Sequence, residues 1–142
     1  MKNFLKLSIS ALTAALLLAG CASDSSAPAT AAMPAMTDTE VANKFKGGEW
    51  VGQWSIAQYN GKFVLIVKAV DGNKVTGEGH FYGTANGDVK EALSNAVVNK
   101  GQLTATLPKS TMKISVKLRD EKNLRGSWEA GGYTGDLTGT RK

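Results

Sequence analysis

The chain has 142 residues and a formal net charge of +5, from 17 lysines and arginines against 12 aspartates and glutamates. It contains no run of five or more like charges, which argues against the basic tails that bind nucleic acid. The chain has a single cysteine, which excludes a disulfide within it. It also has a single histidine, which argues against a transition-metal site.

The first twenty residues have the pattern of a secretory signal. Two lysines precede an apolar stretch over residues 7–18, and a small-residue cleavage point leads to Cys21. The apolar stretch is roughly a dozen residues long, whereas a transmembrane helix needs about twenty. We therefore predict that residues 1–20 are a cleaved signal peptide.

Leu18-Ala19-Gly20-Cys21 resembles the lipobox of bacterial lipoproteins. The resemblance implies a diacylglyceryl group on the Cys21 thiol, cleavage before Cys21 and acylation of the new amine, for example with palmitate. Because Ala22 and not aspartate follows the cysteine, it implies lipid anchoring in the outer membrane, facing the periplasm, or in the cell membrane of a Gram-positive organism. An ordinary signal peptide with an incidental cysteine is the alternative.

A tether and a short helix follow the expected anchor. Residues 21–36 are rich in Ala, Ser, Pro and Thr and cannot bury a core, which predicts a lipidated flexible tether before a domain over 37–142. Thr37 and Glu40 form a capping-box pattern, and Gly47 follows the last periodic residue. We predict a helix over 38–46.

From Glu49 onward, apolar and polar residues alternate with a period of two, which predicts half-buried strands. Turn signals such as Asn60-Gly61 separate them. Residues 83–90 are predicted to form a loop. The predicted strands cover residues 49–56, 63–70, 75–81, 93–98, 103–107, 112–118, 124–130 and 133–139.

Short strands joined by short turns indicate an antiparallel meander, and closing it into a barrel removes both bare edges. Glycines on the apolar side of the strands allow such a sheet to bend sharply. We predict an all-β fold, a small antiparallel up-and-down β-barrel of about eight short strands with one short N-terminal helix. The glycines in question are Gly52, Gly77, Gly79, Gly126, Gly135 and Gly139.

Gly48-Glu49-Trp50, directly after the predicted helix, resembles the Gly-x-Trp opening of the lipocalins and related calycin barrels. The resemblance implies that Trp50 closes one end of the barrel and that an arginine near the last strand, here Arg141, packs over it. The barrel portion is much shorter than that of a typical lipocalin, which argues against a large ligand cavity.

Catalytic candidates are few. His80 and Glu78 share the outer side of one strand, and such a pair can orient an imidazole for base chemistry. Two solvated neighbours on a surface are the ordinary interpretation. The sequence has no nucleophile elbow, zinc-protease motif or phosphate-binding loop. We therefore expect no enzyme, no cofactor and no metal.

Six aromatic residues are candidate ligand contacts. The tryptophans lie on the inward side of their strands, so the sequence indicates either a packed core or a shallow pocket at one mouth of the barrel. Indole and phenol rings stack on sugars and apolar ligands. These residues are Trp50, Trp54, Trp128, Tyr59, Tyr82 and Tyr133.

Val64 and Ile66 lie on the opposite side of their strand from Phe63 and Leu65. We expect the helix to cover them; otherwise they mark a surface for a partner.

The sequence favours a membrane-anchored envelope lipoprotein that carries a non-enzymatic binding module. Its expected ligand is a small apolar molecule, a glycan fragment or an envelope partner protein, and not nucleic acid. The alternative is a purely structural or protein-interaction barrel with a solid core. A hydrolase that uses His80 and Glu78 is the third hypothesis.

Overall fold

The computed structural model describes residues 35–142, of which Met36–Lys142 form one compact unit. The predictions made for the signal peptide, for Cys21 and for most of the tether lie outside the described residues. The described part contains one helix and nine strands. These are α2 (Asp38–Phe45), β1 (Glu49–Ile56), β2 (Tyr59–Asp71), β3 (Lys74–Thr84), β4 (Gly87–Ala92), β5 (Ser94–Asn99), β6 (Gln102–Leu107), β7 (Met112–Leu118), β8 (Asn123–Ala130) and β9 (Tyr133–Arg141).

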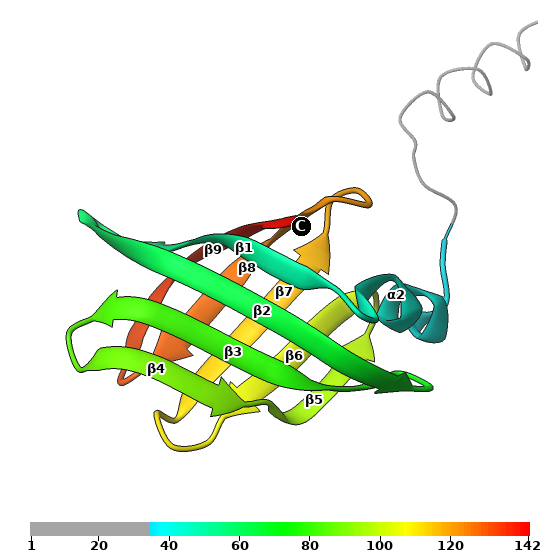
Figure 1. The fold of residues 1–142 in the computed structure, drawn as a ribbon, viewed down its shortest axis with the longest axis horizontal. Helices are drawn as coiled ribbons and strands as arrows, with labels where there is room; N and C mark the ends of the chain where they lie inside the picture. The colour runs from blue at the N-terminus through cyan, green and yellow to red at the C-terminus, as the bar shows by residue number, and fades with distance from the viewer. Residues whose placement is uncertain (1–34) are drawn as a thin grey trace, which may run out of the picture. The chain divides into compact units, whose positions relative to one another are not determined.

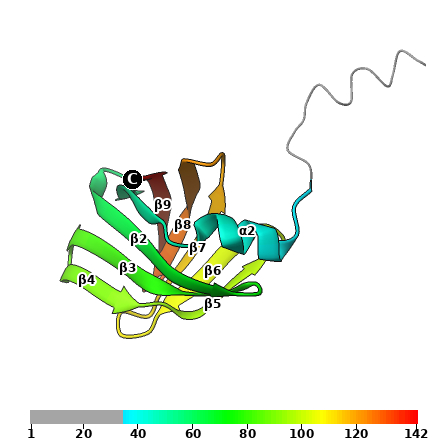
Figure 2. The ribbon, with the colours of Figure 1, turned by 45° about the vertical axis from the view of Figure 1, so that its right-hand side comes forward.

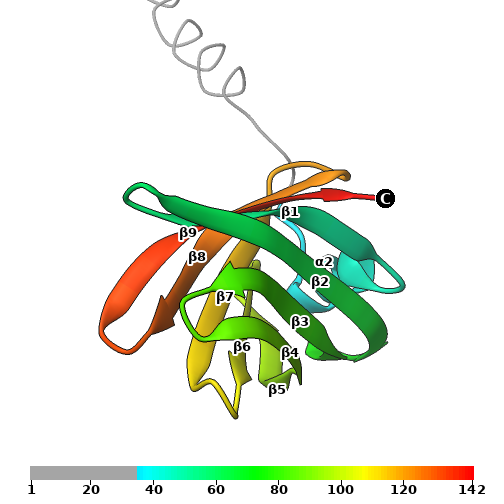
Figure 3. The same ribbon diagram turned by 60° about the vertical axis from the view of Figure 1, so that its left-hand side comes forward.

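The nine strands form one antiparallel sheet in the order β2-β1-β9-β8-β7-β6-β5-β3-β4. An additional pairing of β2 with β3 closes eight strands into a barrel, and β4 lies as an extra strand on β3. Figures 1 and 3 show the strands winding around a common axis. The prediction of an antiparallel β-barrel with one short helix is confirmed.

Strand β4 lies where a loop was expected over residues 83–90. Its residues pair antiparallel with β3, for example Lys90 with His80, and the register shifts once, between Phe81 and Thr84. The strand is mostly exposed and has few apolar residues, so its alternation is too weak to recognise in the sequence. Leu93, expected to begin the next strand, separates β4 from β5, and its amide donates to the Gly77 carbonyl.

One edge of β4 has no strand partner among residues 35–142. The Glu91 carboxylate bridges this edge to the turn between β6 and β7. It accepts hydrogen bonds from the backbone amides of Lys109 and Ser110, at 2.7 and 2.8 Å. A side chain therefore connects the two parts of the wall here.

Helix α2 begins as the capping box predicts. The Glu40 amide donates to the Thr37 hydroxyl at 3.3 Å, and the Thr37 amide donates to the Glu40 carboxylate at 2.7 Å. The helix ends at Phe45, one residue before the predicted end, and Gly47 follows with a φ of 66°. Its apolar side closes one end of the barrel, where it contacts β5 and β2 (Figure 2).

Strands alternate in direction, so the turns gather at two ends of the barrel. The turns after β2, β5 and β7 lie at the end that holds α2, which we call the α2 end. There the Gly101 amide donates to the Asp38 carboxylate at 2.8 Å, and Lys44 pairs with Glu121 at 3.2 Å. The turns after β1, β3, β6 and β8 lie at the opposite end, which we call the far end (Figure 1).

Large apolar side chains fill the interior. Burying such side chains stabilises a fold by roughly 25 cal/mol per Å² of apolar surface removed from water. No polar or charged residue is buried within residues 35–142. The largest fully buried side chains are those of Trp50, Phe45, Phe63, Phe81, Leu65, Leu103, Leu107, Ile114, Leu137, Val67, Val98 and Val116.

Inward glycines allow neighbouring strands to coil tightly. A Cβ atom on Gly52 would lie 1.9 Å from the Thr138 carbonyl oxygen, and one on Gly126 would lie 1.9 Å from that of Ser115. Only glycine fits such a close approach of backbone to backbone. Gly79 differs, since its nearest neighbour would be the Leu107 side chain at 3.3 Å.

The expectation that α2 covers Val64 and Ile66 is wrong. The helix side chains Val41 and Phe45 belong to the interior cluster, which contains neither residue. Val64 is nevertheless only 5% exposed, on the opposite side of β2 from the core. An eight-residue helix that turns its apolar side into the barrel end cannot also cover the outer wall.

Candidate functional site

Trp50 closes the α2 end from inside. Its ring is fully buried, lies 5.8 Å from the Phe45 ring, and has the Arg141 guanidinium 5.6 Å above it. Arg141 also donates to the carbonyls of Lys44 and Lys46, at 3.0 and 3.2 Å. Arg141 therefore packs over Trp50 as expected and holds the end of α2 against the barrel.

Trp54 and Trp128 meet inside the barrel near its far end. Their ring centroids are 6.0 Å apart and nearly perpendicular, which is a favourable arrangement. The Trp54 indole donates to the Tyr82 carbonyl at 2.9 Å. The Trp128 indole nitrogen is buried and has no hydrogen-bond partner among the described residues.

The three tyrosines lie apart from the tryptophans. Tyr59 and Tyr133 are 64% and 68% exposed, at the starts of β2 and β9. The Tyr82 ring is half-buried between the ammonium groups of Lys62 and Lys90, which lie 5.5 and 4.9 Å from its centroid. The structure does not bring the six aromatic candidates together in one pocket.

His80 and Glu78 lie on the outer side of β3. The His80 Nε2 atom is 3.2 Å from the Glu78 carboxylate, which also pairs with Lys68. The hydrogen bond from Lys68, followed by that from His80, lowers the pKa of Glu78 from its usual value of 4.5. Within residues 35–142, no group of three or more His, Cys, Asp or Glu side chains is arranged to hold a metal ion.

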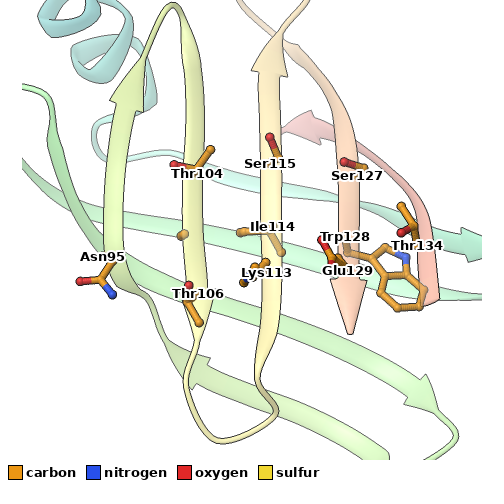
Figure 4. A pocket seen from close by; sticks show the side chains of 11 residues that line it. Asn95, Thr104, Thr106, Lys113, Ile114, Ser115, Ser127, Trp128, Glu129 and Thr134 are labelled. Atoms are coloured by element: carbon orange, nitrogen blue, oxygen red, sulfur yellow. The ribbon is translucent and has the colours of Figure 1, made fainter. Parts of the chain in front are cut away.

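A hollow of about 400 Å³ lies on the outer wall formed by β5 to β9, which we call the hydroxyl hollow. Thr104, Ser115 and Ser127 lie at one level on β6, β7 and β8, as their pairing requires (Figure 4). The hollow is lined by Asn95, Thr104, Ala105, Thr106, Lys113, Ile114, Ser115, Ser127, Trp128, Glu129 and Thr134.

A second hollow, of about 540 Å³, lies nearer the α2 end, which we call the arginine hollow. Its charged groups come from the turn after β7 and from β8, and its hydroxyls come from β9. It is lined by Gly52, Arg119, Asp120, Asn123, Leu124, Arg125, Thr138, Gly139 and Thr140.

Neither hollow is recognisable in the sequence. Their side chains occupy the polar positions of the alternating pattern, which indicate only a solvent-facing side of a strand. Only the pairing register places Thr104, Ser115 and Ser127 in one row. The signal available in the sequence is that these outer positions carry short hydroxyl side chains, not the longer charged ones found on β3 and β4.

Within the described residues, no helix is long and apolar enough to cross a membrane. Comparison with protein-family models, with curated proteins and with solved structures gives no match for this chain. The two hollows and the N-terminal sequence pattern are the features of this chain that bear on its function.

Proposed function

We propose that the chain is a bacterial envelope lipoprotein, anchored through a diacylglyceryl group on Cys21 and facing the periplasm from the outer membrane. The lipobox resemblance supports the anchor, and Ala22 supports the sorting. Mass spectrometry of the membrane-derived chain should show an N-terminal Cys21 that carries acyl chains. A chain that begins elsewhere with a free thiol would contradict the anchor.

We further propose that the barrel is a non-enzymatic binding module whose ligand is a glycan held on the outer wall. The observation that carries this proposal is the hydroxyl hollow, where short side chains from neighbouring strands present hydroxyl groups at one level. Sugar hydroxyls donate and accept hydrogen bonds in turn, and hydroxyl and amide side chains complement both roles. The filled interior favours the outer wall over a cavity for a small apolar ligand.

We also propose that the barrel is related to the calycins and that its strands follow an up-and-down order. Pairing of chain neighbours from β1 to β4 and from β5 to β9, and of β9 with β1, supports the strand order. The contact of Arg141 with Trp50 supports the relation to the calycins.

A glycan array probed with the purified full chain tests the binding function. All three tryptophans belong to the interior cluster, but Trp128 is the one that also lines the hydroxyl hollow. A bound sugar should therefore change the tryptophan fluorescence, and Trp128→Phe should remove most of that change.

A matched pair of variants locates the site. Thr104→Leu fills the hydroxyl hollow and should weaken glycan binding, whereas Thr76→Leu, on the exposed outer side of β3, should not. Absence of any bound glycan, or an equal loss in both variants, would contradict the proposal.

A protein-interaction barrel with a solid core is the second candidate, and one observation favours it. Val64 and its β1 partner Val51 form an apolar strip on the outer wall, next to the partly exposed Ile66. Photo-crosslinking from position 66 in cells should trap one specific envelope protein if this strip is the site. No specific protein crosslink from position 66 would contradict this second candidate.

A further inference from the structure

The outer wall of β7 and β8 carries a pair of like charges. Lys117 on β7 lies directly opposite Arg125 on β8, and both side chains are exposed. Like charges directly opposite each other on one side of a sheet destabilise the pairing. Within residues 35–142, Lys117, Arg125 and the nearby Arg119 form no ion pair. This wall therefore holds a cluster of cations that an anion would neutralise.

One carboxylate, that of Asp120, lines the arginine hollow, where its negative charge offsets one of the three positive charges of Lys117, Arg119 and Arg125 and leaves two. Asp120 accepts hydrogen bonds from the backbone amides of Lys122 and Asn123, at 2.7 and 2.8 Å, and from the Asn123 side chain. Glu121, in the same turn, pairs with Lys44. Toward the far end, Glu129 is opposite Lys113 and Asp136 is opposite Ser127. The wall is thus cationic toward the α2 end and hydroxyl-lined toward the far end.

The two hollows adjoin each other along β8 and β9. Arg125 and Ser127 belong to different hollows but are two residues apart on one strand, so their side chains project on the same side about 7 Å apart. Thr138 lies opposite Arg125 on β9, whereas the β9 partner of Ser127 is Asp136. One extended ligand can therefore contact both hollows.

We propose that the ligand of this wall is an anionic glycan, whose sugar hydroxyls bind in the hydroxyl hollow and whose phosphate or carboxylate group binds between Arg119 and Arg125. This inference rests on the glycan-binding function proposed above and adds the charge of the ligand. Guanidinium groups bind oxyanions through paired, charge-assisted hydrogen bonds. The hydroxyl row distinguishes such a ligand from a simple polyanion, which needs cations alone.

Matched ligand pairs test the inference on the full chain in detergent. The probes are phosphomannan and the same mannan after phosphate removal, polygalacturonate and its methyl ester, and inorganic polyphosphate as an anion without sugar. At least one charged glycan should bind about tenfold more tightly than its uncharged partner, and added salt should weaken this preference.

Two charge-matched double variants locate the anion. Arg119→Gln with Arg125→Gln should remove the preference for the charged glycan, and Arg125→Lys alone should lose part of it. Lys62→Gln with Lys90→Gln removes the same charge from the opposite wall and should leave the preference intact. Circular dichroism and the thermal midpoint confirm that each variant is folded.

Four results would overturn the inference. Equal binding of charged and uncharged glycans would refute the role of charge while leaving the glycan-binding function standing. Polyphosphate binding as tightly as the best glycan, or an equal loss in both double variants, would show non-specific attraction to a basic protein. No binding of any glycan, charged or not, would refute the inference together with the function on which it rests.

Discussion

Glycine and tryptophan occupy matched positions in this barrel. Trp54 lies opposite Gly61, and Trp128 lies opposite Gly135, in the pairings of β1 with β2 and of β8 with β9. A Cβ atom on either glycine would lie within 2.6 Å of the indole nitrogen. Each indole therefore covers the bare backbone of its glycine partner, which compensates for the missing side chain.

The close backbone approach at Gly126 predicts a large loss of stability in Gly126→Ala. The new methyl group would meet the Ser115 carbonyl oxygen, and two strands would have to separate. We expect the free energy of unfolding in urea to fall by about 3 kcal/mol. Gly79→Ala is the matched control, because the flexible Leu107 side chain can yield, and it should cost less than about 1 kcal/mol. Similar losses in both variants would contradict this explanation of the inward glycines.

Arg141 holds helix α2 against the barrel. It stacks over Trp50 and donates to two carbonyls at the end of the helix. Arg141→Ala should lower the free energy of unfolding by about 2 kcal/mol. Arg141→Lys should lose most of the same amount, because an ammonium group lacks the planar fork.

The neighbouring residue supplies the control for that prediction. Lys142 pairs with Glu49 at 2.9 Å, but both side chains are well exposed. Lys142→Ala should therefore change the urea midpoint very little. If Arg141→Ala behaves like Lys142→Ala, the helix is held by its apolar side alone.

At the scale of the whole molecule, acid should destabilise the fold through three carboxylates. Hydrogen bonds from Thr37 lower the pKa of Glu40, the hydrogen bond from Lys68 lowers that of Glu78, and the side chain of Asn123 lowers that of Asp120. Because each pKa is lower in the folded state, each carboxylate stabilises the fold fully above its unfolded pKa, which is 4.5 for Glu and 3.8 for Asp. This stabilisation is lost as the pH falls through the folded pKa.

Urea unfolding measured between pH 2 and 7 checks this dependence. Stability should be nearly constant above about pH 5 and fall below it. Glu40→Gln and Asp120→Asn should each make the fall shallower. Glu129→Gln should not, because the Glu129 carboxylate accepts no hydrogen bond within the described part of the chain. A fall of equal steepness in all the variants would show that other groups control acid stability.

The sequence predicts the core of this molecule better than its outer wall. The capping box and the alternation from Glu49 onward act through local chemistry, so the helix and eight of the strands were predictable. Strand β4 was not, because its ladder with β3 stabilises it without a strong apolar pattern. The candidate site was not predictable either, because Thr104, Ser115 and Ser127 become neighbours only through the register of three strands.

The bridge at Glu91 gives the barrel a weak point. Along the long strand pairs, parting the wall requires several backbone hydrogen bonds to break together, which makes opening rare. Between β4 and the turn after β6, two hydrogen bonds to one carboxylate perform that task. Rotation of a single side chain is enough to release both. Water and small solutes should therefore reach the interior beside Glu91 before they enter between the long strand pairs.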